Sequence, residues 1–294
     1  MAAPPAKVKP GGRAEPFAAP SIGIGRATPY LRPMTIVHLD NRAVLRVAGA
    51  DAVPFLQGLL TQDVALLAPD RPLYAGLLSP QGKALFDMLL YQGCDGVLID
   101  VAADRAEALA KRLTLYRMRK AVEITPSPLV VFAGWNGGER GQTPDPRFAG
   151  LGARWLGEAG GPADAMAYDR HRLAIGVPDS NDIGEDALLW LETGADLLNG
   201  VSFTKGCYVG QENTARMHHR DKVRRRLVPI AFSGDAGDGV IRDSDARQVG
   251  TLRTHRDGLG FAHLRLEAAD GPLFLGATPV TIARPDWLAP AFAA

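Results

Sequence analysis

The sequence predicts an α+β protein that ends in a small antiparallel β-barrel. Two observations lead to this fold class. Between residues 34 and 226, short stretches of alternating apolar residues are interspersed with longer stretches of helical periodicity. After residue 226, the strand-like stretches are all short, and turns rich in Gly and Asp separate them, as is typical of small barrels. We therefore divide the chain into three segments: residues 1–33, 34–226 and 227–294.

The composition is that of a globular protein. Its 294 residues, 46% of them apolar, suffice for two domains, or for one large domain with a smaller appendage. A net charge of +1 argues against a nucleic-acid coat. No apolar stretch reaches the roughly 20 residues that cross a bilayer, so we expect neither nucleic-acid nor membrane partners. The two cysteines, Cys94 and Cys207, are too few for a disulfide framework and predict a reducing compartment.

Residues 1–33 are predicted to be a disordered tail. They are rich in Ala, Pro and Gly, and their prolines oppose a helix. A mitochondrial presequence would also be basic and poor in acidic residues, but it should form an amphipathic helix. We therefore favour a bacterial cytoplasmic location, with the mitochondrial matrix as the alternative.

The next segment opens with a strand, a helix and a hairpin. Ala43–Val47 alternates as a strand does, and Asp51 can cap a helix that carries an apolar stripe. Leu73–Leu78 and Ala84–Tyr91 flank the turn Ser79–Gly82, which predicts a hairpin. The stripe consists of Val53, Leu56, Leu59 and Leu60.

Another strand and helix complete this first α+β half. Val97–Val101 predicts a strand, and Asp104–Arg119 predicts a helix. Cys94 lies in the turn before that strand, where it is most simply a small residue tolerated between glycines.

The second half is less regular. Glu123–Phe132 predicts two strands interrupted by prolines, and Gly134–Gly152 predicts a loop that separates the halves. Ala163–Ala174 predicts a helix. The acidic, polar stretch Asp179–Asp186 is followed by an apolar one, Leu188–Leu198. The predicted barrel strands are 227–232, 249–253, 259–266 and 280–283.

The most informative stretch is Lys205–Glu212, which reads Lys-Gly-Cys-Tyr-Val-Gly-Gln-Glu. The glycines around Cys207 predict that a turn presents its thiol. Positive charge from Lys205 and from the basic residues downstream favours the thiolate, which is the nucleophilic and metal-binding form. The alternative is a small buried side chain between two turn glycines. We expect three side chains to hold the turn: Tyr208, Gln211 and Glu212.

A basic segment, Arg216–Arg226, follows this motif. It predicts either a solvated surface or a site for anionic groups, such as folate carboxylates or an acidic patch of a partner. His218 and His219 could join Cys207 as metal ligands, but we favour a basic surface and predict no metal site. An iron-sulfur cluster usually takes four thiolates, so two cysteines predict no self-contained cluster; a cluster shared with a partner or a second copy stays open.

The stretch Asn199–His219 resembles the signature of the YgfZ-type proteins. These are relatives of the aminomethyltransferase (T-protein) of the glycine cleavage system, and the closer resemblance is to the branch that includes the mitochondrial iron-sulfur assembly factor. Phe55–Asp63, Ser79–Lys83 and Tyr168–Pro178 are similar too, so the likeness covers about residues 33–285. It implies a T-protein-like folate-binding fold of two related α+β halves with a C-terminal barrel.

The resemblance also implies a cleft for tetrahydrofolate. Two departures weaken that implication. T-proteins carry an acidic residue two places after the arginine that matches Arg172, whereas this chain has Ala174, which cannot accept hydrogen bonds from the pterin. T-proteins also have paired aspartates in the hairpin, whereas here Phe86 precedes Asp87. The residues that we assign to ligand binding are Tyr208, Gly210, Gln211, Glu212, Arg216, Asp87 and Arg172.

The function that the resemblance implies is assembly or repair of [4Fe-4S] clusters on target enzymes. Its partners would be iron-sulfur carrier proteins and client enzymes. Cys207 would contact a cluster, a carrier or a reactive folate adduct, while Lys205 and Arg216 stabilise negative charge. We expect an assembly factor without turnover rather than an aminomethyltransferase. The alternatives are a folate-dependent aminomethyl or one-carbon transferase and a folate-responsive regulator without chemistry.

Overall fold

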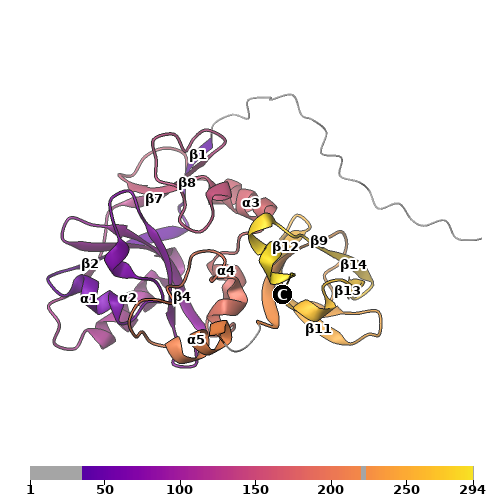
Figure 1. The fold of residues 1–294 in the computed structure, drawn as a ribbon. Coiled ribbons are helices and arrows are strands. Elements are labelled where there is room, and N and C mark those ends of the chain that lie inside the picture. Colours follow the sequence, from indigo (N-terminus) through magenta and orange to yellow (C-terminus); the bar gives the residue numbers. More distant parts are fainter. Residues whose placement is uncertain (1–34, 220–222, 294) are drawn as a thin grey trace, which may run out of the picture. The chain divides into compact units, whose positions relative to one another are not determined.

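The computed structural model describes residues 35–219 and 223–293. Within them the chain is an α+β fold that ends in a closed antiparallel barrel, as the sequence predicts (Figure 1). The predicted disordered tail, residues 1–33, lies outside the described residues. No helix in the described part is both long and apolar enough to cross a membrane.

A five-stranded antiparallel sheet forms the first half, with the strand order β3-β4-β5-β2-β6. The hairpin β3–β4 has the predicted turn at Ser79–Gly82. Because every residue of β3 is buried, this hairpin lies in the interior of the domain. The strands are β2 (Arg42–Ala48), β3 (Leu73–Leu78), β4 (Ala84–Gln92), β5 (Gly96–Ala102) and β6 (Glu123–Pro126).

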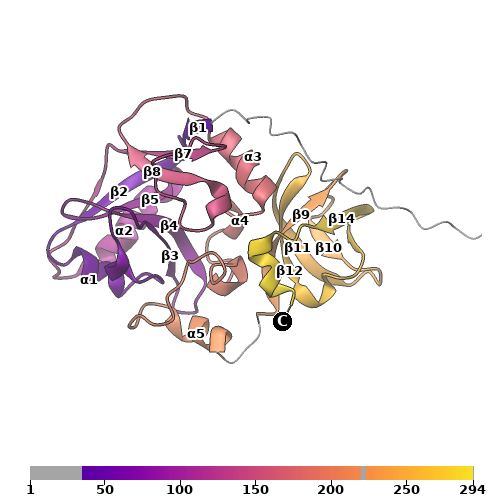
Figure 2. The same ribbon diagram turned by 45° about the horizontal axis from the view of Figure 1, so that its top comes forward.

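Helices α1 (Ala52–Gln57) and α2 (Ala106–Arg117) accompany this sheet (Figure 2). Two details differ from the prediction. Val53 is 36% exposed and does not belong to the apolar stripe, because α1 is only six residues long and buries Phe55 and Leu56 instead. Asp51 precedes α1 but does not cap it with its side chain, and its carboxylate accepts a hydrogen bond from the backbone amide of Ala121 (2.7 Å).

The second half is a three-stranded sheet with the order β1-β7-β8, accompanied by α3 (Ala165–Ile175). Strand β8 begins one residue after the predicted loop ends, in a stretch for which no strand was predicted. The three strands are β1 (Thr35–His38), β7 (Val130–Trp135) and β8 (Ala153–Gly157). Short 3-10 helices occur at Val64–Leu66, Ala103–Arg105, Ala149–Leu151, Trp190–Thr193, Leu266–Ala268 and Asp286–Ala291.

A buried ion pair connects the two halves. Asp100 on β5 accepts from the Nε atoms of Arg42 on β2 and Arg154 on β8, both at 2.7 Å. Arg154 and Asp100 are completely buried, and a second buried pair joins Arg147 to Asp145 (2.8 Å). Charges this deep are tolerated only when they are paired, and the pair of Arg154 with Asp100 constrains how the two sheets pack.

The barrel is closed by six strands in the order β10-β11-β12-β9-β14-β13. The four predicted strands are present. Strands β10 and β13, three residues each, were not predicted, and they close the barrel. The strands are β9 (Arg225–Phe232), β10 (Val240–Arg242), β11 (Gln248–Arg256), β12 (Leu259–Arg265), β13 (Leu273–Leu275) and β14 (Thr278–Ile282).

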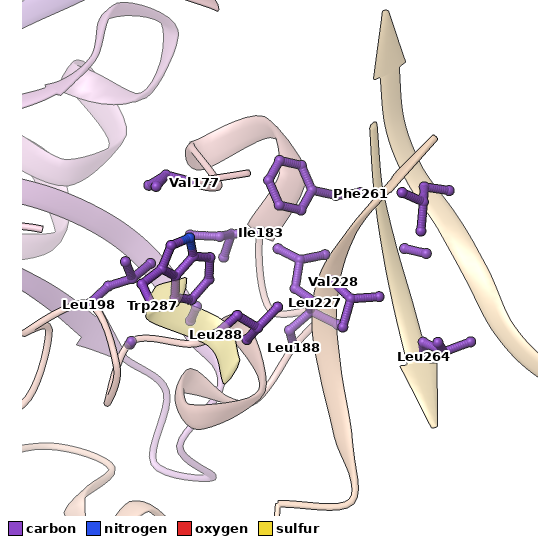
Figure 3. Close-up of a cluster of buried hydrophobic side chains, with 14 of the residues drawn as sticks. Val177, Ile183, Leu188, Leu198, Leu227, Val228, Phe261, Leu264, Trp287 and Leu288 are labelled. Carbon is purple, nitrogen blue, oxygen red and sulfur yellow. The ribbon is translucent and has the colours of Figure 1, made fainter. Parts of the chain in front are cut away.

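A continuous apolar core joins the barrel to the α+β halves (Figure 3). It contains Leu188 and Leu198 from the α+β part, Leu227 from β9, and Trp287 from the last 3-10 helix. Two further helices, α4 (Ser180–Ile183) and α5 (Gln211–His219), lie in the segment that leads to the barrel.

Candidate functional site

The cysteine motif, Lys205–Glu212, docks on the turn of the β3–β4 hairpin. Gly210 has φ +80°, and a Cβ atom there would lie 2.5 Å from the carbonyl oxygen of Ser79. Gly82, also at positive φ, faces the motif from the hairpin. Asn213 donates from Nδ2 to the carbonyl of Gln81 (3.0 Å). Only glycine permits this close approach of two backbones, which explains the second glycine of the motif.

Helix α5 begins directly after Gly210. The Gln211 side-chain oxygen accepts from the backbone amide of Tyr208 (3.3 Å), and the Thr214 hydroxyl donates to the carbonyl of Gly210 (3.2 Å). The Tyr208 side chain is part of the core that reaches the barrel, and burial raises its pKa to about 12. Tyr208 and Gln211 thus hold the turn, whereas Glu212 is exposed.

The ammonium of Lys205 binds backbone oxygens. It lies 5.2 Å from the centroid of the Tyr208 ring, and burial lowers its pKa to about 8. All three N–H groups of an ammonium are used by these acceptors. Its geometry is therefore that of a clamp between the motif and the end of α1. The acceptors are the carbonyls of Gln57 (2.7 Å), Leu60 (2.6 Å) and Gln62 (2.9 Å).

Cys207 has an exposed side chain. A Cβ atom added at Gly206 would meet nothing within 4 Å, so the backbone before the thiol faces open space. The alternative prediction of a small buried cysteine is therefore wrong. His218 stacks on Phe203 with ring centroids 3.6 Å apart. Within residues 35–219 and 223–293, no group of three or more His, Cys, Asp or Glu side chains could hold a metal ion.

One face of α5 borders a surface depression of about 550 Å³. Three residues that we assigned to ligand binding meet there: Gln211, Glu212 and Arg216. Arg216 also donates to the side-chain oxygen of Asn213 (3.0 Å). The basic segment is not one surface, because Arg226 is buried and pairs with Asp196 (2.7 Å); Arg224 and Arg225 are exposed, and residues 220–222 lie outside the described part.

Asp87 lies on β4, in a different pocket of about 140 Å³. Its carboxylate accepts from the Ser180 hydroxyl (2.6 Å), and Arg105 lies over the ring of Phe86 at the same pocket. Burial, and then the charge of Asp179, raises the pKa of Asp87. The pocket shares no lining residue with the depression on α5, so the assigned ligand-binding residues do not form one site.

Arg172 is a connector between elements. Its guanidinium donates to Asp182 of α4 (2.5 Å) and to Asp169 of its own helix. Asp182 in turn accepts from the hydroxyl of Thr254 on barrel strand β11. Ala174, two positions after Arg172, is exposed. The contacts of Arg172 therefore join α3, α4 and the barrel.

Comparisons with known proteins place these features in a family. A family model described as the CAF17 C-terminal beta-barrel domain matches residues 224–290. The human iron-sulfur cluster assembly factor IBA57, mitochondrial, is 36% identical over 85% of this chain and 84% of its own length. The chain belongs to the IBA57 family. The mouse member of the IBA57 family is 34% identical over 86% of this chain and 85% of its own length.

A solved structure supports the fold independently. The glycine cleavage system aminomethyltransferase T from Bartonella henselae superposes with a TM-score of 0.69 over 86% of each chain. At 14% identity this likeness shows the fold alone. The predicted resemblance and the T-protein-like fold are thus confirmed. The named relatives are described as mitochondrial, so they give no support to the predicted bacterial cytoplasm.

Proposed function

We propose that this protein is an accessory factor for assembly or repair of [4Fe-4S] clusters on target enzymes, and that Cys207 contacts the cluster or its carrier. One observation carries the proposal: the thiol is exposed, although the residues on both sides of it are fixed. Lys205 binds the end of α1, and Gly210 packs on the hairpin. Membership of the IBA57 family supports the iron-sulfur role.

The chemistry follows from the properties of a thiol. An exposed cysteine that loses its proton can bind iron as a thiolate. A cluster usually takes four thiolates, and this chain has two cysteines. The remaining ligands would come from an iron-sulfur carrier or from the client enzyme. Cys207 would then supply a single ligand during transfer, without a turnover of its own.

The described residues around Asp87 give little support to a tetrahydrofolate site. The pocket there holds about 140 Å³, whereas ligands of drug size occupy roughly 300–1,000 Å³. Ala174 offers no acceptor, and the guanidinium of Arg172 is paired within the protein. We therefore derive no step through folate. Folate binding, like the one-carbon transferase that would need it, stays a prediction, and titration of the purified protein with tetrahydrofolate would test it.

The test of the proposed function is complementation. Cells lacking the gene would receive the native protein, Cys207→Ser or Cys94→Ser, and aconitase, a [4Fe-4S] enzyme, would be assayed. Cys94 is the matched control because it is also exposed. We expect the native and Cys94→Ser proteins to restore aconitase and Cys207→Ser to fail. If the native protein does not restore it, the assembly role is refuted; if Cys207→Ser restores it fully, only the role of the thiol is refuted.

The compartment of the protein needs its own measurement. A bacterial cytoplasm was predicted, whereas the named relatives are described as mitochondrial. Either compartment would supply iron-sulfur carriers and clients. Imaging of a C-terminally tagged protein in its native cells would decide between the two.

A further inference from the structure

The C-terminal end of α2 presents two large apolar side chains to solvent. Leu115 is 78% exposed and Met118 is 86% exposed, whereas no other large apolar side chain in the described part exceeds 46%. The helix buries Leu109 and Leu113 on its other face. Leu115 lies in the last turn of α2 and Met118 follows its last residue, Arg117, so both exposed side chains lie at the same end of the helix, and we call this pair the apolar spot. In Figures 1 and 2, α2 lies on the side of the molecule opposite to the barrel.

The backbone holds Met118 outward. This residue directly follows the last residue of α2, Arg117, and has φ 51° and ψ −115°. Positive φ is unfavourable for a residue with a side chain. Packing within the domain does not account for an exposed methionine at this position.

Cations surround the apolar spot. Arg112 lies on the preceding turn, and Arg119 and Lys120 follow directly. Within the described part of the chain, none of these three side chains forms an ion pair with a carboxylate. Asp51 lies close by, but its carboxylate accepts from the backbone amide of Ala121 (2.7 Å). We name the whole group the α2 tip patch: Arg112, Leu115, Met118, Arg119 and Lys120.

We propose that the α2 tip patch docks an iron-sulfur carrier protein through an apolar groove rimmed by carboxylates. The inference rests on the proposed function and adds a partner surface to it. An apolar centre within a charged rim is the usual arrangement of an interface hot spot. Leu115 and Met118 would lose water in the groove, while the cations would steer the acidic rim into place.

Charge complementarity selects this occupant. A second copy, docked by two-fold symmetry, would place three cations against three cations. The chain's own residues 1–34 carry five Lys or Arg and one Glu, so they do not complement the patch either. Insertion into a membrane would contribute about 1.5–3 kcal/mol for each buried apolar side chain. Stable anchoring takes a larger apolar face than these two residues offer.

The experiment compares two double variants with a control in the aconitase complementation assay. Leu115→Ser with Met118→Ser removes the apolar spot, and Arg119→Glu with Lys120→Glu reverses the rim. Met166→Ser changes another exposed apolar residue, 42% exposed, which lies on α3 in the second half. We expect that about ten times more of either patch variant than of the native protein is needed to restore half of the aconitase activity. The control variant should need the same amount as the native protein. Thermal melts of the purified variants should match the native protein.

A photo-crosslinking residue at position 115 tests contact directly. It should join a carrier peptide that contains Asp or Glu, and Arg119→Glu with Lys120→Glu should abolish the product; a product with a client enzyme alone would overturn the choice of partner. If the native protein restores aconitase and both patch variants do so equally, the docking inference alone is overturned. If the native protein does not restore aconitase, both the proposed function and the docking inference are refuted. Sedimentation with phosphatidylcholine–phosphatidylserine vesicles that depends on Leu115 and Met118 would overturn docking in favour of a membrane.

Discussion

Asp87 is a buried carboxylate that lies close to another acid. Burial, and then the charge of Asp179, raises its pKa, and Arg42 opposes this effect. The folded state therefore binds the Asp87 proton more tightly than the unfolded chain does. It follows that the contribution of Asp87 to stability is complete below the ordinary carboxyl pKa of 3.8 and is lost as pH rises through the higher folded value.

We predict that Asp87→Asn stabilises the protein at neutral pH. The amide keeps an oxygen to accept the Ser180 hydroxyl but carries no charge. The gain should be about 1 kcal/mol at pH 7 and should shrink as pH falls through the folded pKa toward 3.8. Urea unfolding over this pH range measures it. Asp104→Asn, an exposed acid of the same pocket, is the control; an equal gain at every pH would contradict the explanation.

The exposed position of Cys207 could be predicted, whereas the role of Lys205 could not. Glycines flanking a cysteine indicate a turn from local sequence alone. The acceptors of the Lys205 ammonium are backbone carbonyls 143 to 148 positions earlier, and side-chain identity says nothing about them. For the same reason the buried ion pairs of Asp100 with Arg42 and Arg154 were missed, since strand pairing and packing alone bring them together.

The docking of the motif on the hairpin gives a prediction for the glycines. Gly210→Ala would force a Cβ to within 2.5 Å of the Ser79 carbonyl at φ +80°. We expect a loss of about 1–3 kcal/mol in the free energy of unfolding and faster alkylation of Cys207. Gly206→Ala is the matched control, because a Cβ there meets nothing within 4 Å. Equal effects of the two substitutions would refute the packing argument.

Elements with a regular pattern could be predicted, and elements that depend on tertiary contacts could not. Strand β3 has its predicted bounds, and α2 lies within its predicted range. Helix α5 was missed because it buries only Thr214 and has no apolar stripe. Strands β10 and β13 are three residues long and too short for alternation to show. They are strands because the closed barrel supplies their partners.

One of the three buried apolar clusters in the described residues spans the barrel and the α+β part. The apolar cluster that contains barrel residues Leu227 and Phe261 also contains Leu198 and Tyr208 of the α+β part. Arg226 strengthens this junction by its pair with Asp196 and by donating to the carbonyl of Leu191 (2.9 Å). The barrel therefore supports the segment that carries Cys207.

Substitution of Trp287, near the C-terminal end of the chain, tests whether the barrel stabilises the segment that carries Cys207. The Trp287 side chain is 7% exposed within the shared core, and a Cβ added at Gly194 would lie 3.1 Å from its ring. We predict that Trp287→Ala lowers the free energy of unfolding by about 3–5 kcal/mol in a urea titration. Phe292→Ala, a half-buried aromatic nearby in sequence, should cost less.

The core shared by the barrel and the cysteine segment also predicts a change in the alkylation rate of Cys207. Because Tyr208 belongs to the same core as Trp287, loss of the indole should loosen the turn that presents Cys207. Alkylation of Cys207 should then be faster in Trp287→Ala than in Phe292→Ala, under conditions where both variants remain folded. Equal alkylation rates would mean that the barrel stabilises the chain without fixing the thiol. In that case the clamp by Lys205 and the hairpin contact of Gly210 would suffice to position it.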